Sequence, residues 1–157
     1  MSQEQSTPWT VPWPDSARAP DSPRIARVLI VDDHDVSRRI CAGICDLFHC
    51  AWECASSGAE ALAALGRGSF DVVLMDIQMP GMNGLETTRA IRAMPGRAGQ
   101  VPIVAVTNDA GPEQTQSYLA AGMADVVPKP VPPARLFKAI IDAVGRGRYE
   151  QRSWAAA

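Results

Sequence analysis

The sequence predicts an α/β protein built on one doubly wound parallel sheet of five strands. Five short apolar runs alternate along the chain with segments whose apolar residues recur at helical spacing. The runs are apolar throughout and carry polar residues only at their carboxyl ends, which is typical of parallel strands buried on both faces. Each connection is long enough for a right-handed crossover, so a sheet with helices on both faces follows.

Composition limits the domain count and the classes of partner. The chain has 157 residues, of which 46% are hydrophobic and 20% charged, so we expect one ordinary core and no second domain. Its net charge of −2 and pI near 5.6 predict no general attraction to nucleic acid or anionic lipid. No apolar run approaches the roughly 20 residues that span a bilayer, and the N-terminal residues do not show the basic-then-apolar pattern expected of a secretory leader. We therefore expect a cytoplasmic protein with neither a nucleic-acid nor a membrane partner.

The predicted domain occupies residues 24–148. Residues 1–23 hold five of the thirteen prolines and show no periodicity, which predicts a flexible N-terminal extension. Trp9 and Trp13 are either incidental there or a docking handle for a partner or for the domain itself. From Gly145 onward the sequence predicts a fraying end, and residues 149–157 are assigned to a C-terminal tail.

The first predicted strand, residues 27–32, ends on the acidic pair Asp32 and Asp33. Residues 35–48 are then expected to form a helix, with Arg38 and Arg39 on or near its solvent side. The apolar spacing that predicts this helix is carried by Val36, Ile40, Ile44 and Leu47.

A second strand is predicted at residues 51–55, with Trp52 and Cys54 on one face, and a second helix at residues 58–65. The cysteines Cys41, Cys45, Cys50 and Cys54 have the spacing C-x3-C-x4-C-x3-C. We interpret them as small, partly buried hydrophobes, because a metal site would have to gather four ligands from two elements and the C-x2-C knuckle of zinc sites is absent. A redox role is the alternative.

The central predicted strand, residues 72–75, stops on the carboxylate of Asp76. Pro80, Gly81 and Gly84 then prevent regular structure from continuing, so this carboxylate should lie at the rim where α/β sheets bind their ligands. The remaining predicted elements are helices at 84–94, 112–121 and 133–144 and strands at 102–107 and 124–127.

Polar side chains at the strand ends should share one pocket. The carboxyl ends of the first, third, fourth and fifth strands can meet at one edge of such a sheet, bringing together Asp32, Asp33, Asp76, Thr107 and Lys129. Clustered carboxylates repel one another unless a cation joins them, and Mg2+ is the natural hard divalent ion. Together with a lysine and a hydroxyl, these groups suit a phosphoryl group, with a carboxylate as nucleophile.

Four motifs resemble the receiver domain of two-component response regulators, especially the chemotaxis-type single-domain regulators: VLIVDDHD, DVVLMDIQMPGMNG, PIVAVTND and DVVPKPV, in this order. The resemblance implies the flavodoxin-like (βα)5 fold with strand order 2-1-3-4-5. It also implies a phosphoprotein that is not an enzyme in the ordinary sense, although it assists its own phosphorylation and dephosphorylation.

The resemblance implies a role for each pocket residue. A partner histidine kinase or histidine phosphotransfer protein would phosphorylate Asp76, giving an aspartyl phosphate. Asp32, Asp33, Asp76 and the backbone carbonyl of Gln78 would hold Mg2+. Lys129 would pair with a phosphoryl oxygen, and Thr107 would be the switch hydroxyl. A cis peptide between Lys129 and Pro130 is also implied.

Three positions depart from the family pattern. Relatives often carry Tyr or Phe, coupled to the threonine, where this chain has Val126. Asn108 stands where a small residue is common and could narrow the entrance to the site, while the following Asp109 could orient water. His34 is interpreted as facing a partner or solvent, because Mg2+ prefers oxygen ligands.

Without an output domain, signalling is expected by protein contact, from a monomer or a weak phosphorylation-dependent dimer. The expected output face comprises residues 112–121, 124–127 and 133–144, with Gln114, Tyr118, Val126, Phe137 and Lys138 as candidates. The first helix, near Arg38, Ile40 and Cys41, is the expected upstream docking surface. The downstream target is unknown.

Three alternatives stay open. The chain could be a phosphate sink, or a receiver segment of a hybrid kinase, which MDIQMPGMNG resembles. It could also be a phosphorylation-independent binding module that uses the tryptophan-bearing extension or the cysteines. A flavin protein fits poorly, because the loop after Asp32 lacks the Ser, Thr and Gly that would hold a flavin phosphate.

Overall fold

The computed structural model describes residues 25–156, with side chains to residue 146. The predicted extension at residues 1–23, including Trp9 and Trp13, lies outside the described residues.

Five parallel strands form one sheet in the order β2-β1-β3-β4-β5, which confirms the predicted fold class and strand order. In the sheet register, Val28 of the first strand lies opposite Trp52 of the edge strand on one side and Val72 of the central strand on the other. The strands are β1 (Arg27–Val31), β2 (Ala51–Ala55), β3 (Val72–Asp76), β4 (Ile103–Thr107) and β5 (Asp125–Pro128).

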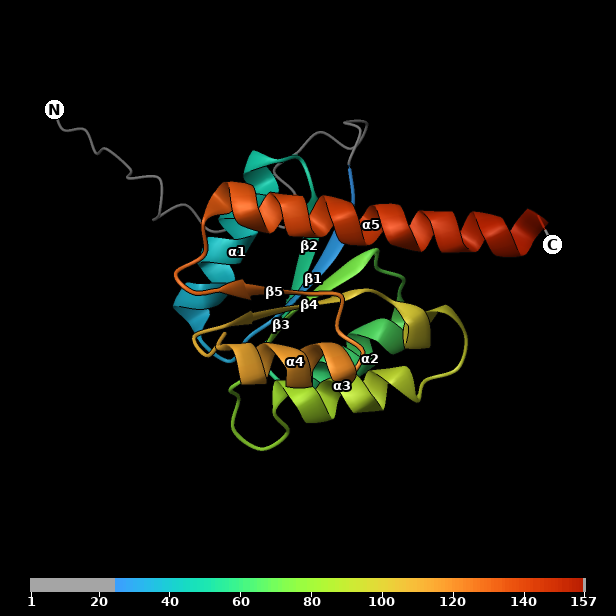
Figure 1. Cartoon of the computed structure of the whole chain (residues 1–157). Helices are drawn as coiled ribbons and strands as arrows, with labels where there is room; N and C mark the ends of the chain where they lie inside the picture. Colours follow the sequence, from blue (N-terminus) through green and yellow to red (C-terminus); the bar gives the residue numbers. More distant parts are fainter. Residues whose placement is uncertain (1–24, 157) are drawn as a thin grey trace, which may run out of the picture.

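Helices cover both faces of the sheet (Figure 1). One face carries α1 (Asp35–Leu47) and α5 (Pro133–Ala156), and the other carries α2 (Gly58–Arg67), α3 (Gly84–Arg92) and α4 (Pro112–Ala120). A short 3-10 helix, η2 (Gly96–Gln100), precedes β4. Within the described part of the chain, no helix has both the length and the apolarity needed to cross a membrane.

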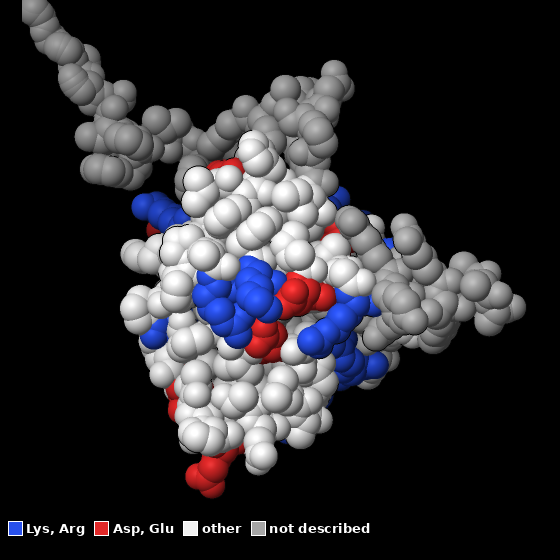
Figure 2. Space-filling view, turned by 45° about the horizontal axis from the view of Figure 1, so that its top comes forward, with Lys and Arg blue, Asp and Glu red and all other residues white. Residues whose placement is uncertain are grey.

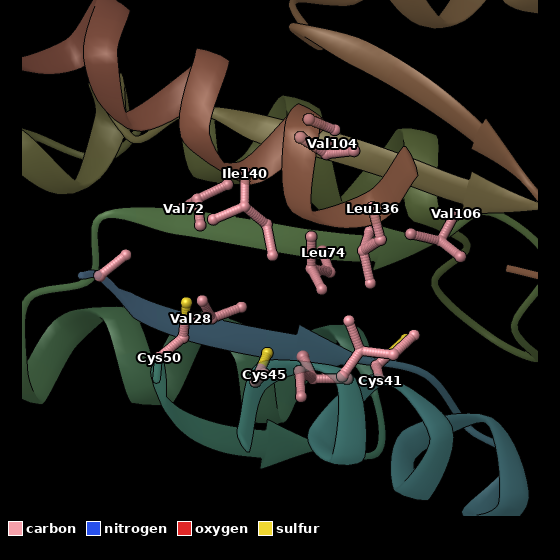
Figure 3. Packing of buried hydrophobic residues seen from close by; sticks show 14 of the residues in the cluster. Val28, Cys41, Cys45, Cys50, Val72, Leu74, Val104, Val106, Leu136 and Ile140 are labelled. Carbon is pink, nitrogen blue, oxygen red and sulfur yellow. The ribbon is translucent and has the colours of Figure 1, made fainter. Parts of the chain in front are cut away.

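The central strands supply apolar side chains to both layers of the core, because they are buried on both faces, whereas β2 at the edge is mostly half-buried. All residues of β3 and β4 are buried. Toward α1 and α5, Val28 and Leu74 pack with Leu136 and Ile140 (Figure 3). The opposite layer contains Leu29, Val73, Met75, Ile91 and Ile103.

The buried side of α1 differs from the predicted one. Val36, Ile40 and Leu47 are exposed, at 66%, 49% and 64% of their surface. The side facing the sheet carries Cys41, Ala42, Ile44 and Cys45. Cysteine buries as readily as a small hydrophobe, so these residues form the helix's inner stripe and leave the larger apolar residues in solvent.

The cysteines are free thiols that pack in the core, which confirms their interpretation as small hydrophobes. Cys41, Cys45 and Cys50 are buried against the strand that carries Val28 (Figure 3), and Cys54 is partly buried. Burial raises the pKa of the Cys41 thiol to about 12. As predicted, Trp52 and Cys54 pack on the same layer of the core.

Helix α5 is longer than the sequence predicted. We expected it to end at Val144, but it continues to Ala156. Glycine in a helix interior costs about 0.5–1 kcal/mol relative to alanine. That penalty does not stop a helix whose first turns are held by a buried apolar stripe, here Leu136, Ile140 and Ala143.

Candidate functional site

Four polar side chains gather at the carboxyl edge of the sheet, as the sequence predicted. Asp32 follows β1, Asp76 ends β3, Thr107 ends β4 and Lys129 follows β5. The Lys129 Nζ donates to Asp32 Oδ2 at 2.9 Å and lies 3.4 Å from Asp76 Oδ1. One ammonium therefore joins carboxylates that come from two different strands.

The chain after β3 folds back against the strand end and thereby places Asp76. The backbone N–H of Gly84 donates to the Ile77 carbonyl at 2.9 Å. A Cβ at Gly84 would collide with the Asp76 carbonyl, so only glycine permits this approach. Helix α3 then starts at once, because Asn83 and Glu86 form a reciprocal capping box.

The electrostatics of the pocket favour a cation. Burial, and then the charge of Asp32, raise the pKa of Asp76 to about 6, although Lys129 and a hydrogen bond from the Gln78 backbone lower it in part. Burial alone would lower the pKa of Lys129, but its hydrogen bonds and the charges of Asp32 and Asp76 outweigh burial and raise that pKa. The lysine is thus an ammonium that neutralises only part of the carboxylate charge.

The donor set fits Mg2+. Asp32, Asp33, His34 and Asp76 each offer a ligand atom, and these atoms lie within 4.8 Å of one another. Asp33 Oδ1 is buried and accepts no hydrogen bond from any described residue. His34 Nδ1 lies 3.1 Å from that oxygen, an ion pair only when the ring is protonated. A buried carboxylate oxygen with no donor, beside two further carboxylates, is the environment that a hard cation satisfies.

Asp33 and Gln78 are the other two predicted metal-holding residues, and among the described residues the hydrogen bonds of the Lys129 ammonium go to Asp32 and Asp76 instead. The Asp33 side chain is 23% exposed, and the Gln78 residue is exposed. The metal contact expected for the Gln78 carbonyl stays a prediction. The implied cis peptide between Lys129 and Pro130 is present.

Arg38 belongs to the site, although the sequence predicted a position on or near the solvent side of its helix for this residue. Its Nη1 donates to the backbone carbonyl of Asp32 at 2.8 Å, and its Nη2 lies 3.4 Å from Asp35 Oδ1. Because α1 starts directly after the acidic pair, its first turn carries residue 38 back over the end of β1. The short spacing between the acidic pair and the arginine was the available signal. Arg39, in contrast, is exposed as predicted.

Thr107 is fully buried and is held by the loop that follows it. Its Oγ1 accepts a hydrogen bond from the Asp109 N–H at 3.0 Å. The Tyr118 hydroxyl in turn donates to the Asp109 carbonyl at 2.9 Å. Asn108, which lies between Thr107 and Asp109 in the sequence, is exposed at the rim of the sheet.

Several residues expected on docking surfaces are buried or engaged instead. Tyr118 and Val126 are 4% and 9% exposed, and Cys41 is 5% exposed. Phe137 stacks on Phe48 of the segment after α1, with ring centroids 4.1 Å apart. The single-sequence pattern could not separate the outer from the inner side of elements whose apolar residues lie on more than one face.

Comparisons with known proteins agree with the geometry. A family model described as the response regulator receiver domain matches residues 28–141. "Probable histidine kinase 4" of rice, Oryza sativa subsp. japonica, is 36% identical over 138 aligned residues, which cover 75% of this chain and 14% of the relative. This chain therefore spans a small part of the length of that curated relative.

Solved structures with the same fold include two at 28% identity or more. The chemotaxis protein CheY4 of Vibrio cholerae superposes with a TM-score of 0.70 at 32% identity, covering 75% of this chain and 98% of that one. The receiver domain of a sensor histidine kinase from Pseudomonas aeruginosa PAO1 has a TM-score of 0.70 at 28% identity, covering 76% of this chain and 98% of that one. Its structure has a magnesium ion coordinated in the active site cleft.

Proposed function

Since the chain belongs to the response regulator receiver domain family, we propose that its Asp76 accepts a phosphoryl group from the phosphohistidine of a histidine kinase or a histidine phosphotransfer protein. The single observation that carries the proposal is the contact of Asp76 with Lys129, 3.4 Å from carboxylate oxygen to ammonium, at the carboxyl edge of the sheet. It is a signalling role in which the protein is the phosphoacceptor of a two-component phosphorelay.

The transfer needs Asp76 as a carboxylate nucleophile. Its oxygen forms the new O–P bond while the P–N bond of the donor's phosphohistidine breaks, which leaves an acyl phosphate on Asp76 and imidazole on the donor. With a pKa of about 6, Asp76 is ionised at neutral pH even before a cation neutralises its surroundings. Lys129 stays close enough to neutralise charge on a phosphoryl oxygen.

Asp32, Asp33, Asp76 and the backbone carbonyl of Gln78 are the proposed holders of Mg2+, supported by the donor-free oxygen of Asp33 and by the magnesium-bound receiver domain from Pseudomonas aeruginosa. When bound, Mg2+ would supply positive charge that offsets the carboxylates and the incoming phosphoryl oxygens. Hydrolysis of the acyl phosphate in the same pocket would make the signal reversible.

The upstream partner is proposed to dock on α1. Val36, Ile40 and Leu47 leave an exposed apolar surface on this helix, which begins directly after the acidic pair. Cys41 does not take part, because it is buried. A surface of this kind suits an apolar helix of the protein that carries the phosphohistidine.

The output face is proposed to be formed by α4, β5 and α5. Figure 2 shows Lys or Arg side chains grouped beside Asp or Glu side chains on this side of the molecule. The Nη2 atom of Arg135 lies 3.0 Å from Asp125 Oδ1, and the Nζ atom of Lys138 lies 2.7 Å from Asp142 Oδ2. Exposed Leu119 and Ile141 add apolar area. Charge pairs that can exchange partners fit a reversible contact with a target or a weak dimer.

A receiver segment of a hybrid kinase is a second candidate. Curated relatives include a protein named "Hybrid signal transduction histidine kinase B" of Dictyostelium discoideum, 33% identical, of which this chain covers 6%. In that setting Asp76 would take its phosphoryl group from the kinase's own histidine and pass it to a phosphotransfer protein.

The test is incubation of the full chain with Mg2+ and acetyl phosphate, and separately with a phosphorylated histidine phosphotransfer protein, followed by intact mass. We expect a gain of one phosphoryl group that chelator prevents and that Asp76→Asn abolishes. Asp142→Asn, on exposed helix surface, is the matched control and should label normally. Failure of both donors to label the parent chain would refute the proposal.

A further inference from the structure

The outward side of α1 carries a continuous row of apolar residues. Val36, Ile40 and Leu47 are 66%, 49% and 64% exposed, although each has a large apolar side chain. Their spacing places them on one side of the helix together with Gly43, which has no side chain, and we call these four residues the α1 stripe. At 1.5 Å per residue the stripe extends over about 16 Å, which is enough to receive two large side chains. Contiguous exposed apolar surface of this kind marks an interaction site.

The chain enters the fold at one end of the α1 stripe. Ile25 is the first described residue, and its backbone N–H donates to the carbonyl of His49 at 3.1 Å. His49 follows Leu47, the last residue of the stripe, by two positions. The segment that precedes Ile25 is therefore tethered beside the stripe.

This preceding segment holds two of the four tryptophans of the chain, Trp9 and Trp13. A tryptophan buries about 150–250 Å² of surface when it is covered, and it is common at interfaces. Pro8 precedes Trp9, and Pro12 and Pro14 flank Trp13. Proline fixes φ, so these residues lower the entropy that the segment loses when it is ordered on a surface.

The segment is long enough to bring both tryptophans onto the α1 stripe. Trp13 and Trp9 lie 12 and 16 residues before Ile25. Twelve residues span at most about 40 Å when fully extended, more than twice the length of the stripe. A tethered group has an effective concentration of about the millimolar range, so a weak apolar contact is enough to keep it bound. A second copy or another protein in dilute solution lacks this advantage.

We propose that Trp9 and Trp13 dock on the α1 stripe of their own chain. The N-terminal segment thereby competes with the phosphohistidine-bearing protein for the surface on which that protein docks. The competition rests on the proposed function of Asp76, whereas the docking of the tryptophans does not.

The competition predicts an effect that depends on the size of the phosphodonor. A phosphotransfer protein has to bind α1, so it reacts only with the fraction of chains whose stripe is uncovered. Acetyl phosphate reaches Asp76 without covering α1. Replacing both tryptophans by alanine should therefore speed labelling by the phosphotransfer protein about two- to tenfold, the range expected for a weak tethered contact, and leave labelling by acetyl phosphate unchanged.

The direct test of docking is NMR of the full chain with labelled methyl groups. We expect nuclear Overhauser contacts between the indole protons of Trp9 and Trp13 and the Cδ1 methyl of Ile40. The signal of this methyl should move when both tryptophans are replaced by alanine, and should not move in the matched control Trp154→Ala. Leu119, which is 46% exposed on α4 at the opposite face of the sheet, provides reference methyl signals that stay in place. Absence of these contacts, with an Ile40 signal that the double variant does not move, overturns the proposal.

Two further outcomes separate this proposal from its alternatives. Tenfold dilution should leave the Ile40 signal in place, because the contact lies within one chain. A signal that moves on dilution would assign the α1 stripe to a second copy and overturn the proposal. In the labelling assay, a double variant that is no faster than the parent with the phosphotransfer protein, or equally faster with both donors, overturns the competition.

Failure of the proposed function gives a different result. In that case neither donor labels the parent chain, or Asp76→Asn is labelled as well as the parent. The Ile40 signal and its contacts with the tryptophans need no phosphorylation, so the NMR experiment still decides whether the segment docks.

Discussion

Asp76→Asn should stabilise the metal-free protein at pH 8. The substitution keeps the shape of the side chain but removes a negative charge that is buried beside Asp32. Asn also retains an oxygen that can accept the weak hydrogen bond from Lys129, which measures 3.4 Å in the parent. The main change is therefore electrostatic.

The magnitude follows from the pKa of Asp76, which burial and then the charge of Asp32 raise from the ordinary 3.8 to about 6. Between these values the folded chain binds a proton that the unfolded chain has released, so the contribution of Asp76 to stability is greatest below pH 3.8 and falls as pH rises through about 6. The ionised carboxyl then destabilises the fold by about 3 kcal/mol. Asp76→Asn should recover up to that amount.

The assay is urea unfolding of parent and variant in chelator at a series of pH values. The difference between the two proteins should be near its maximum at pH 8 and should vanish toward pH 4, where the parent carries a neutral carboxyl. Mg2+ at about 100 times its dissociation constant should stabilise the parent by about 2.7 kcal/mol. Mg2+ should stabilise the Asp76→Asn variant much less. If Asp76→Asn is less stable than the parent at pH 8, or if its gain in the free energy of unfolding does not change with pH, the reasoning is refuted.

Other substitutions test the surroundings of Asp76. Lys129→Met removes the ammonium that both pocket carboxylates share. Urea unfolding in chelator at pH 8 should therefore show a loss of about 3 kcal/mol in the free energy of unfolding, which Mg2+ partly restores. An unchanged midpoint of the urea transition contradicts this. Gly84→Ala should lower the melting temperature, with a loss of about 1–3 kcal/mol, because its Cβ would collide with the Asp76 carbonyl. Gly66→Ala, whose Cβ meets nothing, is its control and should not lower it. Iodoacetamide at pH 8 should label Cys54 first, but slowly, because burial raises its pKa to about 11. The other three thiols are buried and should react only in urea. Rapid labelling of all four cysteines in the native state, seen by mass spectrometry, would refute their burial.

The sheet and the meeting of its polar strand ends were predictable from the sequence, because both depend on local patterns. An apolar run that stops on Asp76, followed by proline and glycine, specifies a strand and its rim whatever packs around it. The parallel topology then brings Lys129 to Asp32 across 97 residues.

The side chains that pack between elements were less predictable. The inner stripe of α1 uses Cys41 and Cys45 where larger apolar residues were available, and that choice depends on the space above β1. Tyr118 fits a solvent-facing or a buried position equally well by spacing, and in the structure it belongs to a buried apolar cluster while its hydroxyl donates to the Asp109 carbonyl in another loop. The end of α5 was missed because glycine is a weak stop signal once a helix is anchored.

The position of the phosphoryl group is the most direct test of the whole account. The full chain would be phosphorylated from a histidine phosphotransfer protein in Mg2+, treated with borohydride, which reduces an acyl phosphate to an alcohol, and digested for peptide mass spectrometry. We expect the reduced residue at position 76 and nowhere else. Phosphorylation that maps to another residue, or a chain that is labelled equally after Asp76→Asn, would contradict the account.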